Sequence, residues 1–202
     1  MASRTLTQCG PIEVRLASLQ SAEVTLASLL NHPERERLDR IVAEADRARF
    51  LLGAAFLRQG VGEHLGIDPK KVEIDRTCTT CGAWHGRPTV PGSDLQLSVA
   101  HSGTVVAVAM AAGYRIGVDV ERIGRRPVGQ IRQWTAAEAR YKAGGGDGLA
   151  TYEIPPPTLG YLVSVATDAP HADLPGHPDA GASNWLHFKD LFPQLPPGGI
   201  VR

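Results

Sequence analysis

The sequence predicts an α+β fold, because its hydrophobic residues change period along the chain. Over residues 31–62 they recur at roughly helical spacing, whereas over residues 95–120 they alternate as in strands or form a continuous apolar run. Aromatic residues make up only 5% of the 202 residues, so we expect a core that is mainly aliphatic and rich in alanine. This length suffices for one domain, or for two small lobes that share a core.

The chain is predicted to enter its helical region from a strand. Residues 11–30 alternate loosely and suit an opening strand followed by a short helix. A stronger helix start lies at Asn31, whose side chain can accept a hydrogen bond from a free backbone N–H. Pro33 and Glu34 favour the same start, since proline has no N–H to leave unpaired and glutamate suits the positive end of a helix.

The helical pattern is expected to form one or two helices that end at the glycines Gly60 and Gly62. A turn over residues 64–69 and a short strand over residues 71–75 are predicted to follow. The next segment, residues 77–94, is rich in turn-forming residues and is interpreted as a loop.

Strands dominate the second half of the predicted fold. Three of them, separated by short turns, are expected to form a meander whose middle strand is buried on both faces. A short helix that stops at three consecutive glycines and one further strand come next. The predicted ranges are 95–99, 104–110 and 115–120 for the meander, 135–143 for the helix and 161–166 for the last strand.

Composition excludes several classes of protein. Lysine and arginine number 21, and aspartate and glutamate also number 21, so the chain lacks the basic surplus of a general nucleic-acid binder. Three cysteines are too few for a disulfide framework. The first ten residues do not resemble a signal peptide, and the longest apolar run, residues 105–112, is too short to span a bilayer. We therefore expect a cytoplasmic protein with no membrane partner.

Two acids two residues apart are the most informative local feature. Asp119 and Glu121 lie in a predicted strand, so their carboxylates share one face, while Val118 and Val120 face the core. Two adjacent carboxylates are the ligand type that Mg²⁺ prefers, with phosphate oxygens and waters completing its coordination. On spacing alone, the simpler interpretation is favoured, a half-buried edge strand with two solvated acids.

A third acid lies one helical turn before a lysine. Glu138 could be a metal ligand or a general base, and Lys142 could bind a phosphate group. The structural alternative is that Thr135 and Glu138 form a capping box and that Glu138 and Lys142 form an ordinary ion pair.

His101 is expected at a strand end, where its imidazole could donate to a phosphate oxygen. The simpler interpretation is a turn or surface histidine.

Cys78 and Cys81 are separated by two residues and His85 follows, which is the pattern of a partial zinc site. Since a closed structural site needs four ligands, two free thiols in a loop are the favoured interpretation.

Taken together and in this order, these segments resemble the 4′-phosphopantetheinyl transferase superfamily, specifically its pseudo-dimeric, surfactin-synthetase-activating type. The match spans roughly residues 33–170. Its most specific parts are similar to the family's G-[IV]-D-[IV]-E and W-[ST]-x-K-E-x-x-x-K-A signatures. The segments that carry the resemblance are HGRP (residues 85–88), LSVAHSG (97–103), GVDVE (117–121) and WTAAEARYKAGGGDGL (134–149).

The resemblance implies a fold of two pseudo-symmetric lobes, each an antiparallel sheet plus helix, with the second lobe truncated. We expect the first lobe at residues 1–113 and a reduced second lobe at 114–170. A tail rich in proline and glycine is expected at 171–202, with a short amphipathic helix at 185–192.

The activity that the resemblance implies is Mg²⁺-dependent transfer of 4′-phosphopantetheine from coenzyme A to a serine of an acyl or peptidyl carrier protein in secondary metabolism. The chain is expected to act as a monomer or weak dimer. The implied metal ligands are Asp119, Glu121 and Glu138, and the implied catalytic residues are Glu138, Lys142 and His101. The implied coenzyme A contacts are Arg35, Arg49, Arg87, Pro88, His101 and Lys142.

The chain also departs from the family pattern. Glu138 follows Asp119 by only 19 positions, where family members have a longer segment that contacts the carrier. Ala137 and Ala100 replace the lysine before the glutamate and the serine before the histidine. These departures support an alternative hypothesis, a repurposed or inactive homologue that binds another ligand or catalyses a different reaction between the lobes.

Overall fold

The computed structural model describes residues 4–9 and 11–170. Nine strands, three α-helices and three short 3₁₀ helices (η) lie within these residues. In chain order they are β1 (Arg4–Cys9), β2 (Ile12–Ser18), η1 (Leu19–Ser21), η2 (Val24–Leu29), α1 (His32–Arg40), α2 (Glu44–Leu65), η3 (Pro69–Lys71), β3 (Asp75–Thr77), β4 (Trp84–Thr89), β5 (Leu95–Ser102), β6 (Val105–Ala112), β7 (Ile116–Arg122), α3 (Val128–Lys142), β8 (Ala150–Glu153) and β9 (Tyr161–Thr167).

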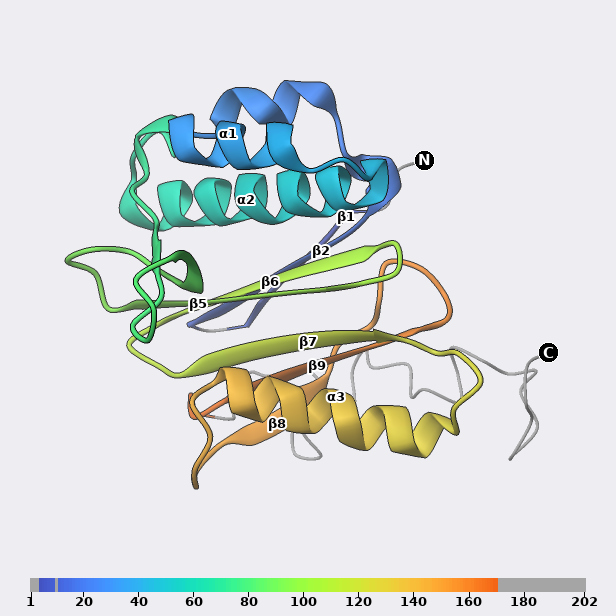
Figure 1. Ribbon diagram of the computed structural model, residues 1–202. Coiled ribbons are helices and arrows are strands. Elements are labelled where there is room, and N and C mark those ends of the chain that lie inside the picture. Colours follow the sequence, from blue (N-terminus) through green and yellow to red (C-terminus); the bar gives the residue numbers. More distant parts are fainter. Residues whose placement is uncertain (1–3, 10, 171–202) are drawn as a thin grey trace.

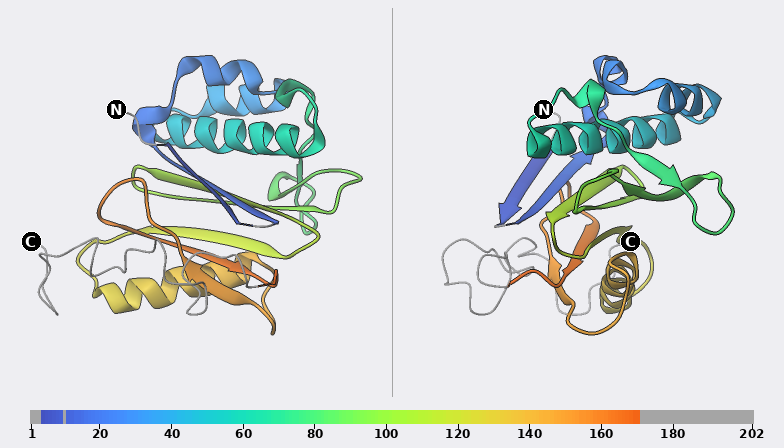
Figure 2. Two further views of the ribbon diagram at one scale, coloured as in Figure 1. Left: turned by 180° about the vertical axis from the view of Figure 1, so that it is seen from behind. Right: turned by 90° about the vertical axis from the view of Figure 1, so that its left-hand side faces the viewer.

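The elements form four layers, which Figures 1 and 2 show from several sides. Helices α1 and α2 cover one face of a six-stranded sheet, a three-stranded sheet lies against the other face, and α3 covers the outer side of the smaller sheet. The larger sheet has the order β1-β2-β6-β5-β4-β3 and the smaller one β7-β9-β8, and all pairings are antiparallel. The predicted α+β class is therefore confirmed, with a second sheet half the size of the first.

Strand β6 lies at the centre of the core, as its apolar sequence predicts. Val106, Val108 and Met110 pack with the helical layer, whereas Ala107 and its neighbours of the same face pack against the second sheet. All of β6 up to Ala111 is buried. The prediction of a strand buried on both faces is confirmed, because alternate side chains of β6 face the helices and the remaining ones face the second sheet.

The start of α1 matches the prediction from its sequence. Asn31 is the N-cap, and its side chain accepts a hydrogen bond from the N–H of Glu34 at 3.0 Å. The Glu34 carboxylate in turn accepts from the N–H of Asn31, which completes a capping box. In the preceding segment the predicted strand is β2, and the helical part that follows it consists of the 3₁₀ helices η1 and η2.

The predicted end of the second helix is wrong, because α2 continues past Gly60 and Gly62 to a left-handed cap at Gly66 (φ +67°). Both glycines lie where a neighbour comes close. A Cβ on Gly60 would lie 2.0 Å from Cε of Met110, and one on Gly62 would lie 2.8 Å from the carbonyl oxygen of Ile67. They therefore provide room for packing and do not end the helix.

Several strands differ from the prediction. In the segment at 71–75, Lys71 ends η3, residues 72–74 form no regular element, and β3 starts only at Asp75. The expected loop contains β4. Strand β4 pairs with β5 at a single registered position, Thr89 with Gln96, and contains Pro88, which has no N–H for a ladder. This weak pairing explains why the sequence of β4 suggests a loop. Strands β1 and β8 were not predicted.

The predicted three-strand meander is also wrong. Strands β5 and β6 form a hairpin, but β7 leaves this sheet and pairs with β9, from Ile116 opposite Thr167 to Arg122 opposite Tyr161. Alternation shows that a segment is extended and does not show which sheet it joins. The last predicted strand is confirmed as β9.

Helix α3 begins at Val128, seven residues before the predicted start, and ends just before the glycines as expected. Thr135 therefore lies inside the helix, where its hydroxyl donates to the carbonyl of Ile131 at 2.7 Å. The alternative in which Thr135 and Glu138 form a capping box is wrong for this reason. The amphipathic helix expected at 185–192 lies outside the described residues.

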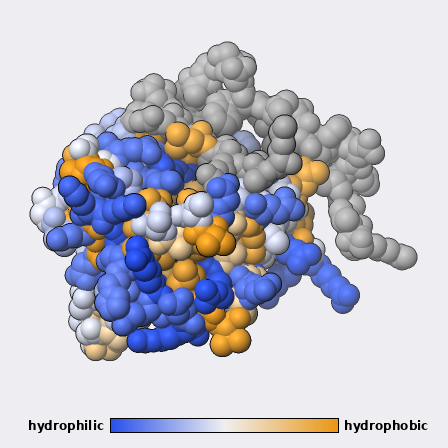
Figure 3. Space-filling model, turned by 90° about the horizontal axis from the view of Figure 1, so that it is seen from above, coloured by the Kyte–Doolittle hydropathy of each residue, from blue (hydrophilic) through white to orange (hydrophobic). Residues whose placement is uncertain are grey.

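Among the helices of the described ranges, none is both long and apolar enough to cross a bilayer. Seen from above the helical layer, hydrophilic residues cover much of the surface, with smaller hydrophobic areas between them (Figure 3).

Candidate active site

The candidate site begins where α3 lies directly on the backbone of β7. A Cβ added to Gly117 would lie 2.0 Å from the carbonyl oxygen of Ala139 and 2.6 Å from the nitrogen of Ala143. Only a residue without a side chain allows this approach. The contact places the last turn of α3, which carries Lys142, beside Asp119, two residues further along β7.

We expect Gly117→Ala to displace the end of α3, because the new methyl group meets backbone atoms that no side-chain rotation can move. The free energy of unfolding should fall by about 1–3 kcal/mol, as for overpacking in a core. Urea denaturation checks this result. Gly129→Ala is the matched control: its Cβ meets nothing within 4 Å, so stability should be unchanged or rise by up to about 1 kcal/mol. Equal stability of the two variants would contradict the close contact.

Asp119 is the centre of the site and is only 6% exposed. Its Oδ1 accepts a hydrogen bond from Nζ of Lys142 at 2.6 Å, whereas its Oδ2 is buried without a hydrogen-bond partner among the described residues. Burial raises the pKa of Asp119; Lys142 opposes this effect, and the charges of Glu121 and Glu138 add to it. The three acids and Lys142 are thus electrostatically coupled, and the interpretation of two solvated acids is wrong for Asp119.

Asp119, Glu121 and Glu138 have the oxygen donors that suit a magnesium ion. The unpartnered Oδ2 of Asp119 is a buried acceptor that a cation would satisfy, and Glu121 and Glu138 are only partly buried. The oxygens of these three carboxylates do not all lie within 4.8 Å of one another. Within residues 4–9 and 11–170, a different set of side chains meets that distance, Cys78, Cys81 and His85. The residue types and the orphaned oxygen fit Mg²⁺, provided that the two glutamate side chains turn inward.

His101 lies beside a second basic residue, Arg49 of α2. The Arg49 guanidinium donates twice to the carbonyl of Gly103, at 2.8 and 2.6 Å, and pairs with Asp46. Burial lowers the pKa of His101 and the charge of Arg49 lowers it further; Asp46 opposes this effect in part, and Lys142 contributes a smaller lowering. His101 is therefore a neutral hydrogen-bonding group at neutral pH.

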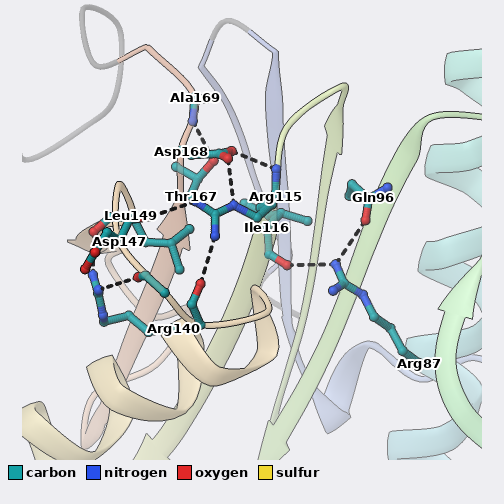
Figure 4. A network of polar contacts seen from close by, with 12 residues as sticks. Arg87, Gln96, Arg115, Ile116, Arg140, Asp147, Leu149, Thr167, Asp168 and Ala169 are labelled. Carbon is teal, nitrogen blue, oxygen red and sulfur yellow. Dashed lines mark hydrogen bonds and ion pairs between the residues drawn. The ribbon is translucent and has the colours of Figure 1, made fainter.

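The remaining predicted coenzyme A contacts lie further along the two sheets. Arg87 donates to the carbonyls of Leu97 and Ile116, both at 3.1 Å, and so connects β4 with β5 and β7 (Figure 4). Burial lowers its pKa. Pro88, which follows it in β4, is buried. Arg35 in α1 is exposed, and its guanidinium donates to the carbonyl of Ser28 at 3.4 Å, so its contacts do not link it to Arg49.

Two serines that the sequence analysis did not select connect the sheets at this site. Ser98 accepts a hydrogen bond from the N–H of Val118 at 3.0 Å, and Ser102 accepts one from the N–H of Arg122 at 3.2 Å. The hydroxyl of Ser102 also donates to Oε2 of Glu121 at 3.2 Å. These side chains replace a strand partner along the free edge of β7 and position Glu121. Their spacing of four residues in β5, on one face, was the signal that could have identified them.

A network around Arg115 fixes the glycine-rich turn after α3 (Figure 4). Arg115 donates to Asp168 at 2.7 Å and to the carbonyls of Gly145 and Asp147 at 2.8 and 2.9 Å. Burial alone would raise the pKa of Asp168, but hydrogen bonds and charge from Arg115 outweigh burial, and the pKa is lowered. Arg140 binds the same turn through the carbonyl of Gly146. The turn therefore holds the end of α3, and with it Lys142.

Comparison with known proteins places this geometry in context. Residues 18–113 match the family model described as 4′-phosphopantetheinyl transferase, N-terminal. A phosphopantetheinyl transferase of Thraustochytrium sp. is 31% identical over 113 residues, which are 53% of this chain and 37% of the relative. The 4′-phosphopantetheinyl transferase HetI of Nostoc sp. is 27% identical over 161 residues, which are 63% of this chain and 64% of the relative. The chain thus spans less than two thirds of the length of each of these relatives.

The residues that match the family model include Arg49, Arg87 and His101. The acids of β7 and α3 lie after the matched segment. The resemblance of the sequence, the pair of antiparallel sheets with their helices, and these matches agree. The chain is therefore similar to the 4′-phosphopantetheinyl transferases, and residues 18–113 match the N-terminal part of that family.

Proposed function

We propose that the chain transfers 4′-phosphopantetheine from coenzyme A to a serine of an acyl or peptidyl carrier protein. The observation that carries the proposal is Asp119, buried against Lys142 with one oxygen unpartnered and two further carboxylates close enough to raise its pKa. A buried acceptor with this excess of negative charge favours a bound cation. The carrier is proposed to belong to secondary metabolism, and the enzyme to act in the cytoplasm as a monomer or weak dimer.

In the proposed site, Asp119, Glu121 and Glu138 would hold Mg²⁺ together with coenzyme A. The ion would supply positive charge against the pyrophosphate oxygens, the usual requirement of phosphoryl-type transfer. Ser102 orients Glu121 through its hydroxyl, and Lys142 keeps the Asp119 carboxylate in place.

The chain's own groups are proposed to move one proton and to neutralise developing charge. The carrier serine oxygen forms a bond to the phosphorus that bears the pantetheine arm, and the bond from that phosphorus to 3′,5′-ADP breaks. Glu138 accepts the serine proton, directly or through a water. Lys142 and neutral His101 donate hydrogen bonds to phosphate oxygens, where charge accumulates as the ADP leaves.

The nucleotide end of coenzyme A is assigned to the first lobe. Arg49 is proposed to bind the 3′-phosphate, since it lies beside His101 and is only partly buried. Arg35 is proposed to assist from α1, after leaving its weak contact with Ser28. Arg87 and Pro88 are proposed to border the adenine, where Arg87 is already fixed by two carbonyls.

The test is incubation of the chain with coenzyme A, Mg²⁺ and a panel of apo carrier proteins, followed by mass spectrometry of each carrier. One carrier should gain the mass of phosphopantetheine, and the gain should disappear when a chelator removes Mg²⁺. A known transferase in parallel shows that the carriers are competent. If no carrier gains mass, the proposal fails, and calorimetry with coenzyme A then tests the alternative, a homologue that binds without transfer.

A further inference from the structure

A second cluster of potential metal ligands lies in the turn between β3 and β4, and the proposed function does not use it. Cys78, Cys81 and His85 each offer one ligand atom, and the three atoms lie within 4.8 Å of one another. The sulfur of Cys81 is 3.0 Å from Nε2 of His85. Over the described part of the chain, no other three histidine, cysteine, aspartate or glutamate side chains meet this distance.

The backbone of the turn holds the cluster together. The N–H of Cys78 donates to the carbonyl of Ala83, and the N–H of Gly82 donates to the carbonyl of Cys78, both at 2.8 Å. Gly82 has a φ of +71°, a conformation that side chains disfavour. This reversal of the chain brings His85 back to the two cysteines, so three residues of a short segment converge without any contribution from elsewhere in the fold.

The cluster is open to solvent on one side. Cys78 is partly buried, whereas Cys81 and His85 are exposed, so an ion has access from solvent.

We propose that Cys78, Cys81 and His85 bind one zinc ion whose fourth coordination position is occupied by water. Two thiolates and an imidazole favour zinc over magnesium or calcium, which prefer oxygen ligands. Asp75 is not available as the fourth ligand through its Oδ1, which accepts from the N–H and the hydroxyl of Thr77 at 2.8 and 2.6 Å. The thiol protons pass to solvent on binding, and no oxidation or reduction takes place.

Zinc would add to the support of the start of β4, where Trp84 pairs with Thr77 of β3 and its carbonyl accepts a hydrogen bond from Arg37. This strand shares a single registered pair with β5, yet it carries Arg87, which reaches the carbonyls of Leu97 and Ile116 on two different sheets. His85 is two residues before Arg87. An ion at the turn therefore fixes the strand that connects the sheets, and this role does not depend on the transferase reaction.

Metal titration of the full chain tests the proposal. Untagged protein, stripped with a chelator under reducing conditions, is titrated with zinc chloride against a chromophoric zinc indicator. We expect one equivalent to be taken from the indicator. Titration with cobalt(II) should give thiolate-to-metal charge-transfer absorption and the intense visible bands of four-coordinate cobalt.

Matched variants assign the ligands. Cys78→Ser, Cys81→Ser and His85→Asn should each weaken zinc binding by at least about 10-fold, and the two cysteine variants should reduce the charge-transfer absorption. Cys9→Ser and His64→Asn, which alter the same residue types outside the cluster, should bind as the unchanged protein does. Circular dichroism of each variant confirms that it is folded.

Three results would overturn the proposal: failure of the reduced, stripped protein to compete with the indicator, zinc binding by Cys81→Ser equal to that of the unchanged protein, or a Cys78–Cys81 disulfide that persists under the reducing conditions. Hydrogen exchange tests whether zinc stabilises the start of β4. Zinc should slow amide exchange over residues 78–87, and unchanged exchange in the zinc-bound protein would contradict this stabilisation.

Discussion

Asp119→Asn is expected to reduce transfer to the carrier protein by at least about 100-fold without destabilising the fold. The substitution keeps the shape of the side chain but removes the negative charge that faces Lys142 and the proposed metal. Losing one electrostatic group from a preorganised site has effects of this size. Stability should be unchanged or higher, because the buried Oδ2 of Asp119 has no partner in the described structure and burial already raises the pKa of this carboxyl.

Initial rates of carrier modification and urea denaturation of the same preparation provide the two measurements. Asp39→Asn is the matched control, since Asp39 is exposed and its contact with Arg47 is 3.9 Å long. It should change neither quantity by more than a small amount. Transfer by Asp119→Asn at a rate close to that of the control would remove Asp119 from the proposed site.

A second substitution separates the role of Lys142 from that of Asp119. Lys142→Met leaves a buried carboxylate without its cation, so it should destabilise the unchanged protein more than it destabilises the Asp119→Asn variant. The difference between these two effects measures the coupling across the 2.6 Å ion pair. If the effects are equal, the pair in the structure does not contribute to stability.

Local signals in the sequence were sufficient for several parts of the fold. Asn31 and Glu34 predict the start of α1 because a capping box depends only on residues close in sequence. The apolar run of β6 predicts burial on both faces for a similar reason. The end of α2 could not be predicted, because Gly60 and Gly62 accommodate Met110 and the backbone of Ile67, which are contacts made only in the folded protein.

The sequence also does not show which sheet a strand joins, because strand pairing depends on contacts made only in the folded protein. β7 alternates like a third strand of a meander, yet it pairs with β9, and its free edge is satisfied by the side chains of Ser98, Ser102 and Arg87. Candidate site residues were accessible through their motifs. Their arrangement was not, since it depends on Gly117 admitting the backbone of α3.

The helical layer contains a buried ion pair that no motif indicated. Nε of Arg58 in α2 is 2.5 Å from Oε2 of Glu34 in α1, and the two side chains are 0% and 2% exposed. Arg58 also donates to the carbonyls of Pro69 and Val72, at 3.3 and 2.9 Å. The same Glu34 oxygen accepts the capping hydrogen bond from Asn31. One pair therefore connects α1, α2 and the chain that leads to β3.

Arg58→Met is expected to lower the free energy of unfolding by about 3–5 kcal/mol, the range for leaving one member of a buried pair without its partner. The cause is the Glu34 carboxylate, which would remain buried with only the Asn31 N–H to stabilise its charge. Urea denaturation provides the measurement. Glu36→Gln, which alters an exposed pair with Arg40, is the matched control and should change stability by at most about 0.5 kcal/mol.

The double variant Glu34→Gln with Arg58→Met keeps this prediction testable if the single variant does not fold. It removes both charges while the glutamine oxygen can still accept the capping hydrogen bond from Asn31. The double variant loses the hydrogen bonds from Arg58 to the carbonyls of Pro69 and Val72 just as Arg58→Met does, so the two variants differ only in the charge at residue 34. The double variant should therefore be more stable than Arg58→Met alone. If it is no more stable, the loss arises from packing around the arginine stem, and the unpaired charge is not its cause.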